Sequence, residues 1–265
     1  MRIANSMRIA TWNVNSVRQR VEALVSYLRE VKPDVLCLQE LKCLEEQFPR
    51  LEVEAEGYNV AIHGQKSYNG VAIISKAPME TAMGLPGDEG DAQSRYIEAV
   101  IPWGKTVLRV GCLYLPNGNP LGTDKYAYKL AWMDRLIAHA KKLLTYEERL
   151  VLCGDFNVIP EARDVYDPEA WLGDALYAPP TRQKFRELQA LGFTDALRAT
   201  TDAAKQYTFW DYQAGAWPKN HGLRIDHLLL SPQAADRLQS VTVDREMRGK
   251  DKPSDHVPVR VNLKD

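Results

Sequence analysis

The stretch "RLVLCGDFNV", residues 149–158, decides the fold of this chain. It starts with Leu- and Val-rich residues over the length of a strand and runs directly into Asp155 and Asn157. A continuous apolar run bounded by turn residues predicts a buried strand. Polar side chains at the end of such a strand can meet others where neighbouring strands end. The stretch therefore predicts a sheet whose strand ends carry the chemistry.

The same event recurs along the chain. Apolar runs also end in polar residues at Asn13 and Asn15 ("RIATWNVN"), Glu40 ("DVLCLQE") and Asp226 ("RID"), and "SDH" carries Asp255 and His256. One such ending is common, because Asn and Asp are ordinary turn residues. Several in one chain indicate that the strand ends converge on one rim of a sheet.

The wider pattern predicts an α/β fold. Ten apolar runs of strand length interleave with three helical segments, expected after an N-cap at Ser16, around residues 130–144, and from Thr181 to Gly192. Many strands with few long helices predict two packed sheets with helices outside. No Ser-, Gly- or Pro-rich linker divides the chain, so we expect one domain over residues 7–265. Residues 1–6 precede a second "MRIA" and are an N-terminal extension or an alternative start.

Composition narrows the class of protein. The 34 Lys and Arg residues balance 35 Asp and Glu residues, so there is no global positive field, and any phosphate site must gather charge locally. The four cysteines form no CxxC motif, and three lie in apolar runs, which predicts reduced core residues in a cytoplasmic protein. No apolar stretch reaches the ~18 residues of a membrane span.

The expected rim combines carboxylates, carboxamides and one imidazole, without a cysteine ligand. Oxygen-rich sites of this kind suit Mg²⁺ or Mn²⁺, and a His oriented by a carboxylate suits a phosphate oxygen. Phosphodiester hydrolysis needs a metal, a base and neutral donors that align the phosphate. A nucleophilic Ser254 is disfavoured, because "PSDHVPV" lacks a strand-turn-helix elbow.

Eight motifs carry a family resemblance. In chain order they are "TWNVNSVR", "CLQELK", "YNGVAI", "LYLPNG", "LCGDFNV", "YTFWDY", "GLRIDHLLLS" and "PSDHVPV". Together they resemble the exonuclease III family of abasic-site (AP) DNA repair endonucleases, within the endonuclease/exonuclease/phosphatase superfamily. The resemblance implies a four-layered, DNase I-like α/β sandwich with mostly antiparallel or mixed sheets. It also implies Mg²⁺-dependent hydrolysis 5′ to abasic sites in duplex DNA, with 3′-to-5′ exonuclease and 3′-phosphodiesterase activities and Mn²⁺ as a substitute.

The resemblance also implies residue roles. The implied metal and metal-shell residues are Asn13, Glu40, Asp155, Asn157 and Asp255. The implied catalytic residues are Tyr114, Asp155, Asn157, Asp226 and His256, with Asp226 orienting the His256 ring and Asp155 activating water. The residues expected to contact DNA are Lys42, Tyr68, Asn69, Gly70, Asn117, Phe209, Trp210, Lys219, Asn220, Leu223, Arg224 and Ile225.

Residues 207–226 favour DNA among phosphate substrates, because aromatic and aliphatic side chains stand beside Lys219, Asn220 and Arg224. Such a wall could receive an extruded sugar that has lost its base. The expected partner is duplex DNA with abasic sites or blocked 3′ ends, and no membrane partner is expected. The protein is expected to be a cytoplasmic monomer that associates with the nucleoid when it acts. Two alternatives stay open: a phosphatase for inositol or lipid phosphates, and an inert DNA-binding module.

Overall fold

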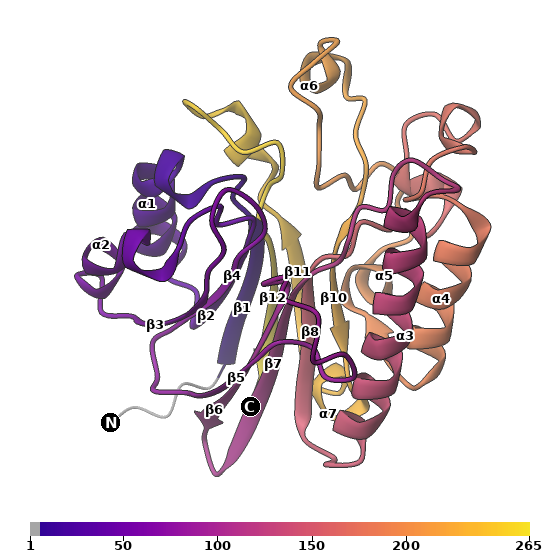
Figure 1. Cartoon of the computed structure of the whole chain (residues 1–265). Coiled ribbons are helices and arrows are strands. Elements are labelled where there is room, and N and C mark those ends of the chain that lie inside the picture. The colour runs from indigo at the N-terminus through magenta and orange to yellow at the C-terminus, as the bar shows by residue number, and fades with distance from the viewer. Residues whose placement is uncertain (1–5) are drawn as a thin grey trace.

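The computed structural model describes residues 6–265, in which two six-stranded sheets pack face to face (Figure 1). The first sheet has the order β11-β12-β1-β2-β4-β3 and the second the order β5-β6-β7-β8-β10-β9. Apolar side chains of both sheets form the core between them, among them Ile9 and Cys37 from the first and Val110 and Cys153 from the second. The expected N-terminal extension lies outside the described residues apart from Ser6.

Each sheet contains one parallel pair at its centre, β1 with β2 and β7 with β8, and the other neighbours are antiparallel. The strands of the first sheet are β1 (Ser6–Asn13), β2 (Val35–Gln39), β3 (Asn59–His63), β4 (Val71–Ser75), β11 (Leu238–Val243) and β12 (Val259–Lys264). Those of the second are β5 (Glu80–Met83), β6 (Tyr96–Trp103), β7 (Thr106–Tyr114), β8 (Arg149–Asp155), β9 (Thr194–Asp195) and β10 (Asp226–Leu230). The predicted mixed sheets are confirmed.

Helices cover the outer faces and complete the four layers (Figure 1). The helices are α1 (Val21–Val31), α2 (Arg50–Glu54), α3 (Asp124–Leu144), α4 (Pro179–Ala190), α5 (Ala196–Thr200), α6 (Ala216–Lys219) and α7 (Pro232–Ala235), with 3-10 turns η1 (Val17–Gln19), η2 (Glu45–Gln47), η3 (Ala162–Asp164), η4 (Glu169–Trp171) and η5 (Arg245–Gly249). α1 packs Leu24 and Leu28 against the first sheet, and α3 packs Trp132 and Met133 against the second. Among the described residues, no helix combines the length and apolarity that crossing a membrane requires.

Two details of the prediction were wrong. Ser16 does not cap α1: its φ is 84°, its side chain makes no capping bond, and α1 begins only at Val21 after η1. The edge strands β5 and β9 were not predicted, because β5 is exposed along its whole length and β9 has only two residues. Neither strand has the apolar run on which the other strands were recognised.

Gly154 allows β7 and β8 to remain paired up to their last residues, where Leu113 lies opposite Gly154 and Tyr114 opposite Asp155. A Cβ atom at Gly154 would lie 1.9 Å from the carbonyl oxygen of Leu113, inside the backbone of the neighbouring strand. The backbone φ of 150° at this glycine is also one that other residues seldom adopt. The glycine therefore determines how closely Asp155 approaches the end of β7.

We predict that Gly154→Ala lowers the free energy of unfolding by on the order of 3 kcal/mol or more, because β7 and β8 must separate. Urea denaturation followed by circular dichroism measures the change. Gly173→Ala is the control, since a Cβ there meets no atom within 4 Å. Equal stability of the two variants would contradict the close approach.

Candidate active site

Polar side chains from four strand ends meet at one rim of the two sheets. Asn13 ends β1, Glu40 directly follows β2, and Tyr114 and Asp155 end β7 and β8. Asn13 Nδ2 joins the sheets, because it donates to Glu40 Oε1 (2.8 Å) and to Asp155 Oδ2 (3.0 Å). The expected convergence of strand ends is therefore observed.

Strands β10 and β12, one from each sheet, begin at the same rim. Asp226 opens β10 directly opposite Asp155, and His256 lies just ahead of β12. His256 Nδ1 is 2.9 Å from Asp226 Oδ2, while Nε2 faces Asp155 Oδ2 at 3.7 Å. We call Asn13, Glu40, Tyr114, Asp155, Asp226 and His256 the strand-end rim.

The hydroxyl of Thr208 fixes the orienting carboxylate, because it donates to Asp226 Oδ2 at 2.6 Å and accepts from the backbone N–H of Ile225. Thr208 stands in "YTFWDY", but its hydroxyl was not assigned a role from the sequence. A Thr at this position gives no signal by itself, since its partner lies 18 residues away.

Burial sets the electrostatics of the strand-end rim, since His256 is 4% and Asp155 1% exposed. Burial opposes a charged imidazole, but the carboxylates of Asp226 and Asp155 outweigh it and raise the pKa of His256 to about 10. Burial raises the pKa of Asp155 to about 7, helped by Asp226 and Glu40 and opposed by His256. A charged donor thus stands beside a carboxyl that exchanges its proton near neutral pH, as general acid-base chemistry requires.

The strand-end rim also offers oxygen ligands for a metal. Glu40, Asp155 and His256 each place one ligand atom within 4.8 Å of the others. Although burial raises the pKa of Glu40, Lys42 and Asn13 outweigh it, so the pKa falls below its usual value and the carboxylate stays charged. A charged imidazole has no free lone pair for a metal. The ligands that fit are therefore oxygens, which suit a hard divalent cation.

Asp255 does not join this cluster. Its Oδ1 accepts from Asn15 Nδ2 at 3.1 Å, and Asn15 in turn accepts from Lys42 Nζ. The neighbouring Ser254 is buried and donates to the backbone oxygen of Asn13 at 2.7 Å. Ser254 thus fastens the loop before β12 to β1, while Asp255 lies beside the metal candidates.

Two carboxamides extend the strand-end rim. Asn117 Nδ2 donates to Asn157 Oδ1 (3.3 Å), and the backbone N–H of Asn157 donates to Asp155 Oδ1 (2.8 Å). Asn157 Nδ2 donates to the carbonyl of Leu115 (2.8 Å), which anchors the side chain from below. Asn117 is exposed, so a phosphate could reach its amide. The structure thus brings the predicted neutral donors beside Asp155.

Backbone conformations outside the common regions occur at the same positions. Glu40 has a φ of 53° and Asn157 a φ of 46°, both in the left-handed region that non-glycine residues seldom adopt. Such conformations persist where the surrounding structure enforces them, and they cluster at functional sites.

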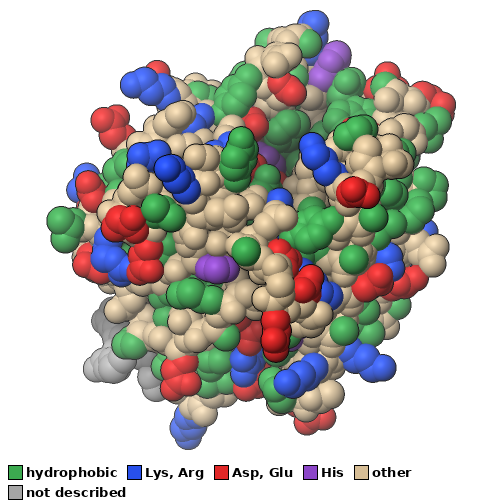
Figure 2. Space-filling model, viewed as in Figure 1, with side chains coloured by type: hydrophobic (Ala, Val, Ile, Leu, Met, Phe, Trp, Pro, Cys, Tyr) green, Lys and Arg blue, Asp and Glu red, His purple; other side chains and the backbone are tan. Residues whose placement is uncertain are grey.

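A groove of about 500 Å³ runs from Asn117 past Tyr68 and Asn69, two of the predicted duplex contacts. Lys42 contacts the loop that carries Tyr68 and Asn69, because its backbone N–H donates to the backbone oxygen of Asn69 at 3.0 Å. Its Nζ lies 2.8 Å from the Glu40 carboxylate. Positive and negative side chains are interspersed over the face shown in Figure 2, in keeping with the net charge of -1. Any attraction for phosphate is therefore local.

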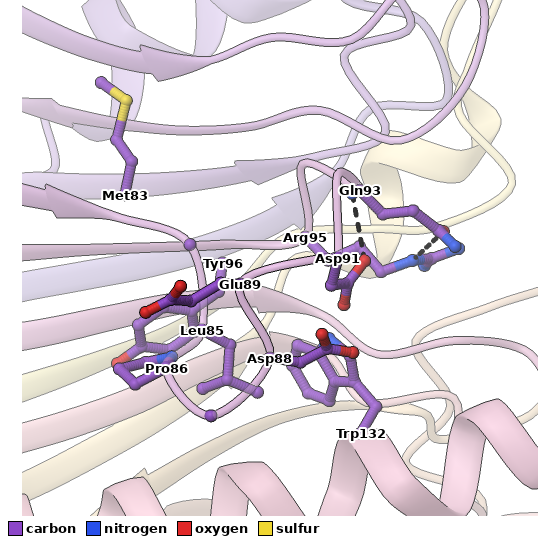
Figure 3. A pocket seen from close by; sticks show the side chains of 12 residues that line it. Met83, Leu85, Pro86, Asp88, Glu89, Asp91, Gln93, Arg95, Tyr96 and Trp132 are labelled. Carbon is purple, nitrogen blue, oxygen red and sulfur yellow. Dashed lines mark hydrogen bonds between the residues drawn. The ribbon is translucent and has the colours of Figure 1, made fainter.

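A second hollow, of about 290 Å³, lies between the loop around Leu85 and Trp132 (Figure 3). Asp88, Glu89 and Asp91 line it, so its charge disfavours phosphate. Arg95 lies between the hollow and the groove, where its guanidinium contacts Gln93 Oε1 (2.7 Å) and stacks over the Tyr114 ring (4.9 Å). Arg95 therefore supports Tyr114 from the side of the hollow.

The expected apolar wall is assembled but mostly closed. Phe209 meets His256 edge-on, with ring centroids 4.9 Å apart, and packs against Leu223 and Ile225. Leu223 and Ile225 are each only 2% exposed, so they back the surface, and Phe209 alone of the three is partly open. At the edge of this cluster, Tyr166 stacks on His221 with ring centroids 4.4 Å apart.

Two of the predicted DNA contacts were wrong. Arg224 is 1% exposed, and its guanidinium is held by Asp164 (2.7 Å) and Asp195 (2.8 Å), so it is not available to a phosphate. Trp210 is buried in the apolar cluster that also holds the α1 residues Leu24 and Leu28, and its Nε1 donates to Asn220 Oδ1. Lys219 is exposed on α6, and its Nζ donates to the carbonyl of Ala214.

Comparison with known proteins gives a consistent set of relatives. The model of the Endonuclease/Exonuclease/phosphatase family matches residues 10–256. Exodeoxyribonuclease III of Haemophilus influenzae is 32% identical over 97% of this chain and 100% of its own. A 3′ phosphatase from Neisseria, NExo, solved with product DNA hairpin, is 39% identical with a TM-score of 0.93, covering 98% and 100% of the two chains. An AP endonuclease from Archaeoglobus fulgidus is 36% identical with a TM-score of 0.92, covering 98% and 99%.

We predict that Asp226→Asn moves the titration of His256 from about pH 10 toward neutral pH, because the variant loses the charge that holds the imidazolium. The folded pKa exceeds the ordinary value of 6.5, so the pair stabilises the fold fully below that pH and loses this contribution as the pH rises through about 10. Histidine NMR titration in EDTA measures the His256 midpoint in the wild type and in the variant. His63, whose pKa burial lowers, is the internal control and should not move. An unchanged His256 midpoint would contradict the pairing.

We also predict that Arg224→Met lowers the free energy of unfolding by about 3–5 kcal/mol, because Asp195 is left buried without its cation and Asp164 keeps only Arg198. Chemical denaturation measures the change. Lys219→Met should alter stability by less than about 0.5 kcal/mol, since Lys219 is exposed. A stable Arg224→Met variant with weakened DNA binding would restore Arg224 as a DNA contact.

Proposed function

Because the chain belongs to the endonuclease/exonuclease/phosphatase family, and within it to the exonuclease III group of AP endonucleases, we propose that it is a Mg²⁺-dependent DNA repair nuclease. It hydrolyses the phosphodiester 5′ to abasic sites in duplex DNA and also acts on 3′ ends as an exonuclease and phosphodiesterase. The observation that carries this proposal is the buried His256–Asp226 pair beside Asp155, at a rim with oxygen ligands.

The residues of the strand-end rim divide the work as follows. Glu40, with Asn13 and Asp155 beside it, would hold the metal. Charge neutralisation of the non-bridging phosphate oxygens is the chemistry that a bound Mg²⁺, or Mn²⁺ in its place, supplies. His256 donates from Nε2 to one of these oxygens, and Asp226 keeps its ring charged and oriented.

Asp155 acts on the attacking water. Burial raises the pKa of Asp155 to about 7 in the metal-free protein, and this carboxylate can take up the proton of the water. Asn157, which bonds Asp155 through its backbone, and Asn117 align the phosphate with neutral donors. Burial, Glu40 and Asp155 raise the pKa of Tyr114 well above its usual value, so its hydroxyl stays protonated and can donate to the leaving oxygen.

Duplex DNA fits the surroundings of the strand-end rim better than a soluble phosphate. The groove past Asn117 and Tyr68 provides amide and tyrosine side chains that could contact one DNA strand. Phe209 offers an apolar face beside His256. The names of two relatives, an exodeoxyribonuclease and a 3′ phosphatase bound to product DNA, support the same class. We propose further that the protein works as a monomer and that it is cytoplasmic, the latter in keeping with its four free cysteines.

Incubation of the protein with a duplex that carries one tetrahydrofuran abasic analogue tests this proposal. We expect incision 5′ to the analogue with Mg²⁺ or Mn²⁺ and none with EDTA. Parallel duplexes with a recessed end and with a 3′ end blocked through a phosphodiester measure the other activities. If no duplex is cleaved with either metal, the nuclease proposal fails, and release of phosphate from inositol phosphates instead would favour the phosphatase.

We predict that His256→Asn lowers the incision rate by roughly 10²-fold or more while DNA binding is retained, because one oriented donor to the transition state is lost. Asp155→Asn should be at least as impaired, since it loses the proton acceptor. Single-turnover rates and binding titrations measure the two effects. His63→Asn on β3 and Asp236→Asn at the surface are matched controls with expected wild-type rates. Undiminished turnover in His256→Asn would refute its role.

A further inference from the structure

Lys129 is a fully buried lysine directly behind the strand-end rim. It belongs to α3 and shares the buried face of that helix with Trp132, Met133 and Leu136, where an apolar residue would be ordinary. A lysine is almost never fully buried unless its amine is satisfied. Its position therefore needs a reason.

The amine of Lys129 bonds two loops that carry candidate catalytic residues. Nζ donates to the backbone oxygen of Asn117, after β7, at 3.0 Å and to the backbone oxygen of Asn157, after β8, at 2.6 Å. The chain also wraps closely over the lysine stem: a Cβ at Gly118, where φ is 85°, would lie 2.5 Å from Lys129 Cδ. The lysine thus cross-links the two loops from beneath.

This cross-link determines where the two carboxamides lie. One hydrogen bond of 3.3 Å joins the side chains of Asn117 and Asn157. Asn157 has further anchors at Leu115 and Asp155, whereas Asn117 is exposed and has no other bond to β8 or the loop that follows it among the described residues. Without Lys129, the only direct bond from Asn117 to the loop after β8 among the described residues would be the one of 3.3 Å to Asn157.

We propose that Lys129 is a positioning residue, which holds Asn117 at the distance from Asn157 and Asp155 that aligns the scissile phosphate. This inference rests on the proposed function. Burial lowers the pKa of Lys129 to about 7, with Asp155 and Asp174 opposing the shift. Both the ammonium and the neutral amine can donate two hydrogen bonds, so the cross-link is present in either form.

Lys129→Met tests the inference, because it keeps the stem and removes both donors. Kinetics with the abasic duplex should show kcat lower by about 10- to 100-fold, as expected for a misplaced phosphate ligand, with KM nearly unchanged. Adding Asn117→Ala to Lys129→Met should then cost much less than Asn117→Ala costs alone. Lys142→Met, at the exposed end of the same helix, is the control and should retain the wild-type rate.

A folded Lys129→Met with wild-type kcat would overturn the inference, and so would full additivity with Asn117→Ala. If Lys129→Met does not fold, Lys129→Leu, which also removes both donors, is judged by the same criteria. Hydrogen-deuterium exchange of residues 115–119 and 156–159 gives a readout that needs no activity, and it should rise in the variant. If the wild-type chain cleaves no duplex, the proposed function fails, while unchanged exchange in both loops would overturn the role of Lys129 itself.

Discussion

The ion pair between Asp226 and His256 is the interaction on which the account of this protein depends. Asp226 belongs to one sheet and His256 to the entry of a strand in the other, so their bond of 2.9 Å holds the two layers together at the strand-end rim. It also gives the imidazole its charge in a place where burial alone would remove it. The same charge faces Asp155 and sets the proton balance of the whole rim.

The sequence predicted the strand-end rim because its signals are local. Each apolar run and the polar residues that follow it are contiguous, and the parallel pairs β1–β2 and β7–β8 bring such ends to one edge of each sheet. Asn13, Glu40, Asp155, Asp226 and His256 were therefore found from strand ends. Gly154 shows how local chemistry secures this geometry, since no other residue fits beside Leu113.

The environment of buried charges could not be predicted, because it is made by residues far apart in the chain. Arg224 was expected to face DNA, yet its partners Asp164 and Asp195 stand 60 and 29 positions away. Trp210 stands among polar residues in the sequence, as an exposed aromatic would, but its side chain lies in the core. Lys129 gave one usable signal, a lysine at the spacing of an apolar helix face, but its partners Asn117 and Asn157 appear only in the fold.

The pH dependence of single-turnover incision tests the central claim most directly, measured on an alkali-stable abasic duplex for the wild type and Asp226→Asn. If the charged His256 donates to the phosphate, the alkaline fall in rate should lie near pH 10 in the wild type and move to lower pH in the variant. Profiles that fall at the same pH in both proteins would contradict the claim that Asp226 maintains a catalytic charge on His256.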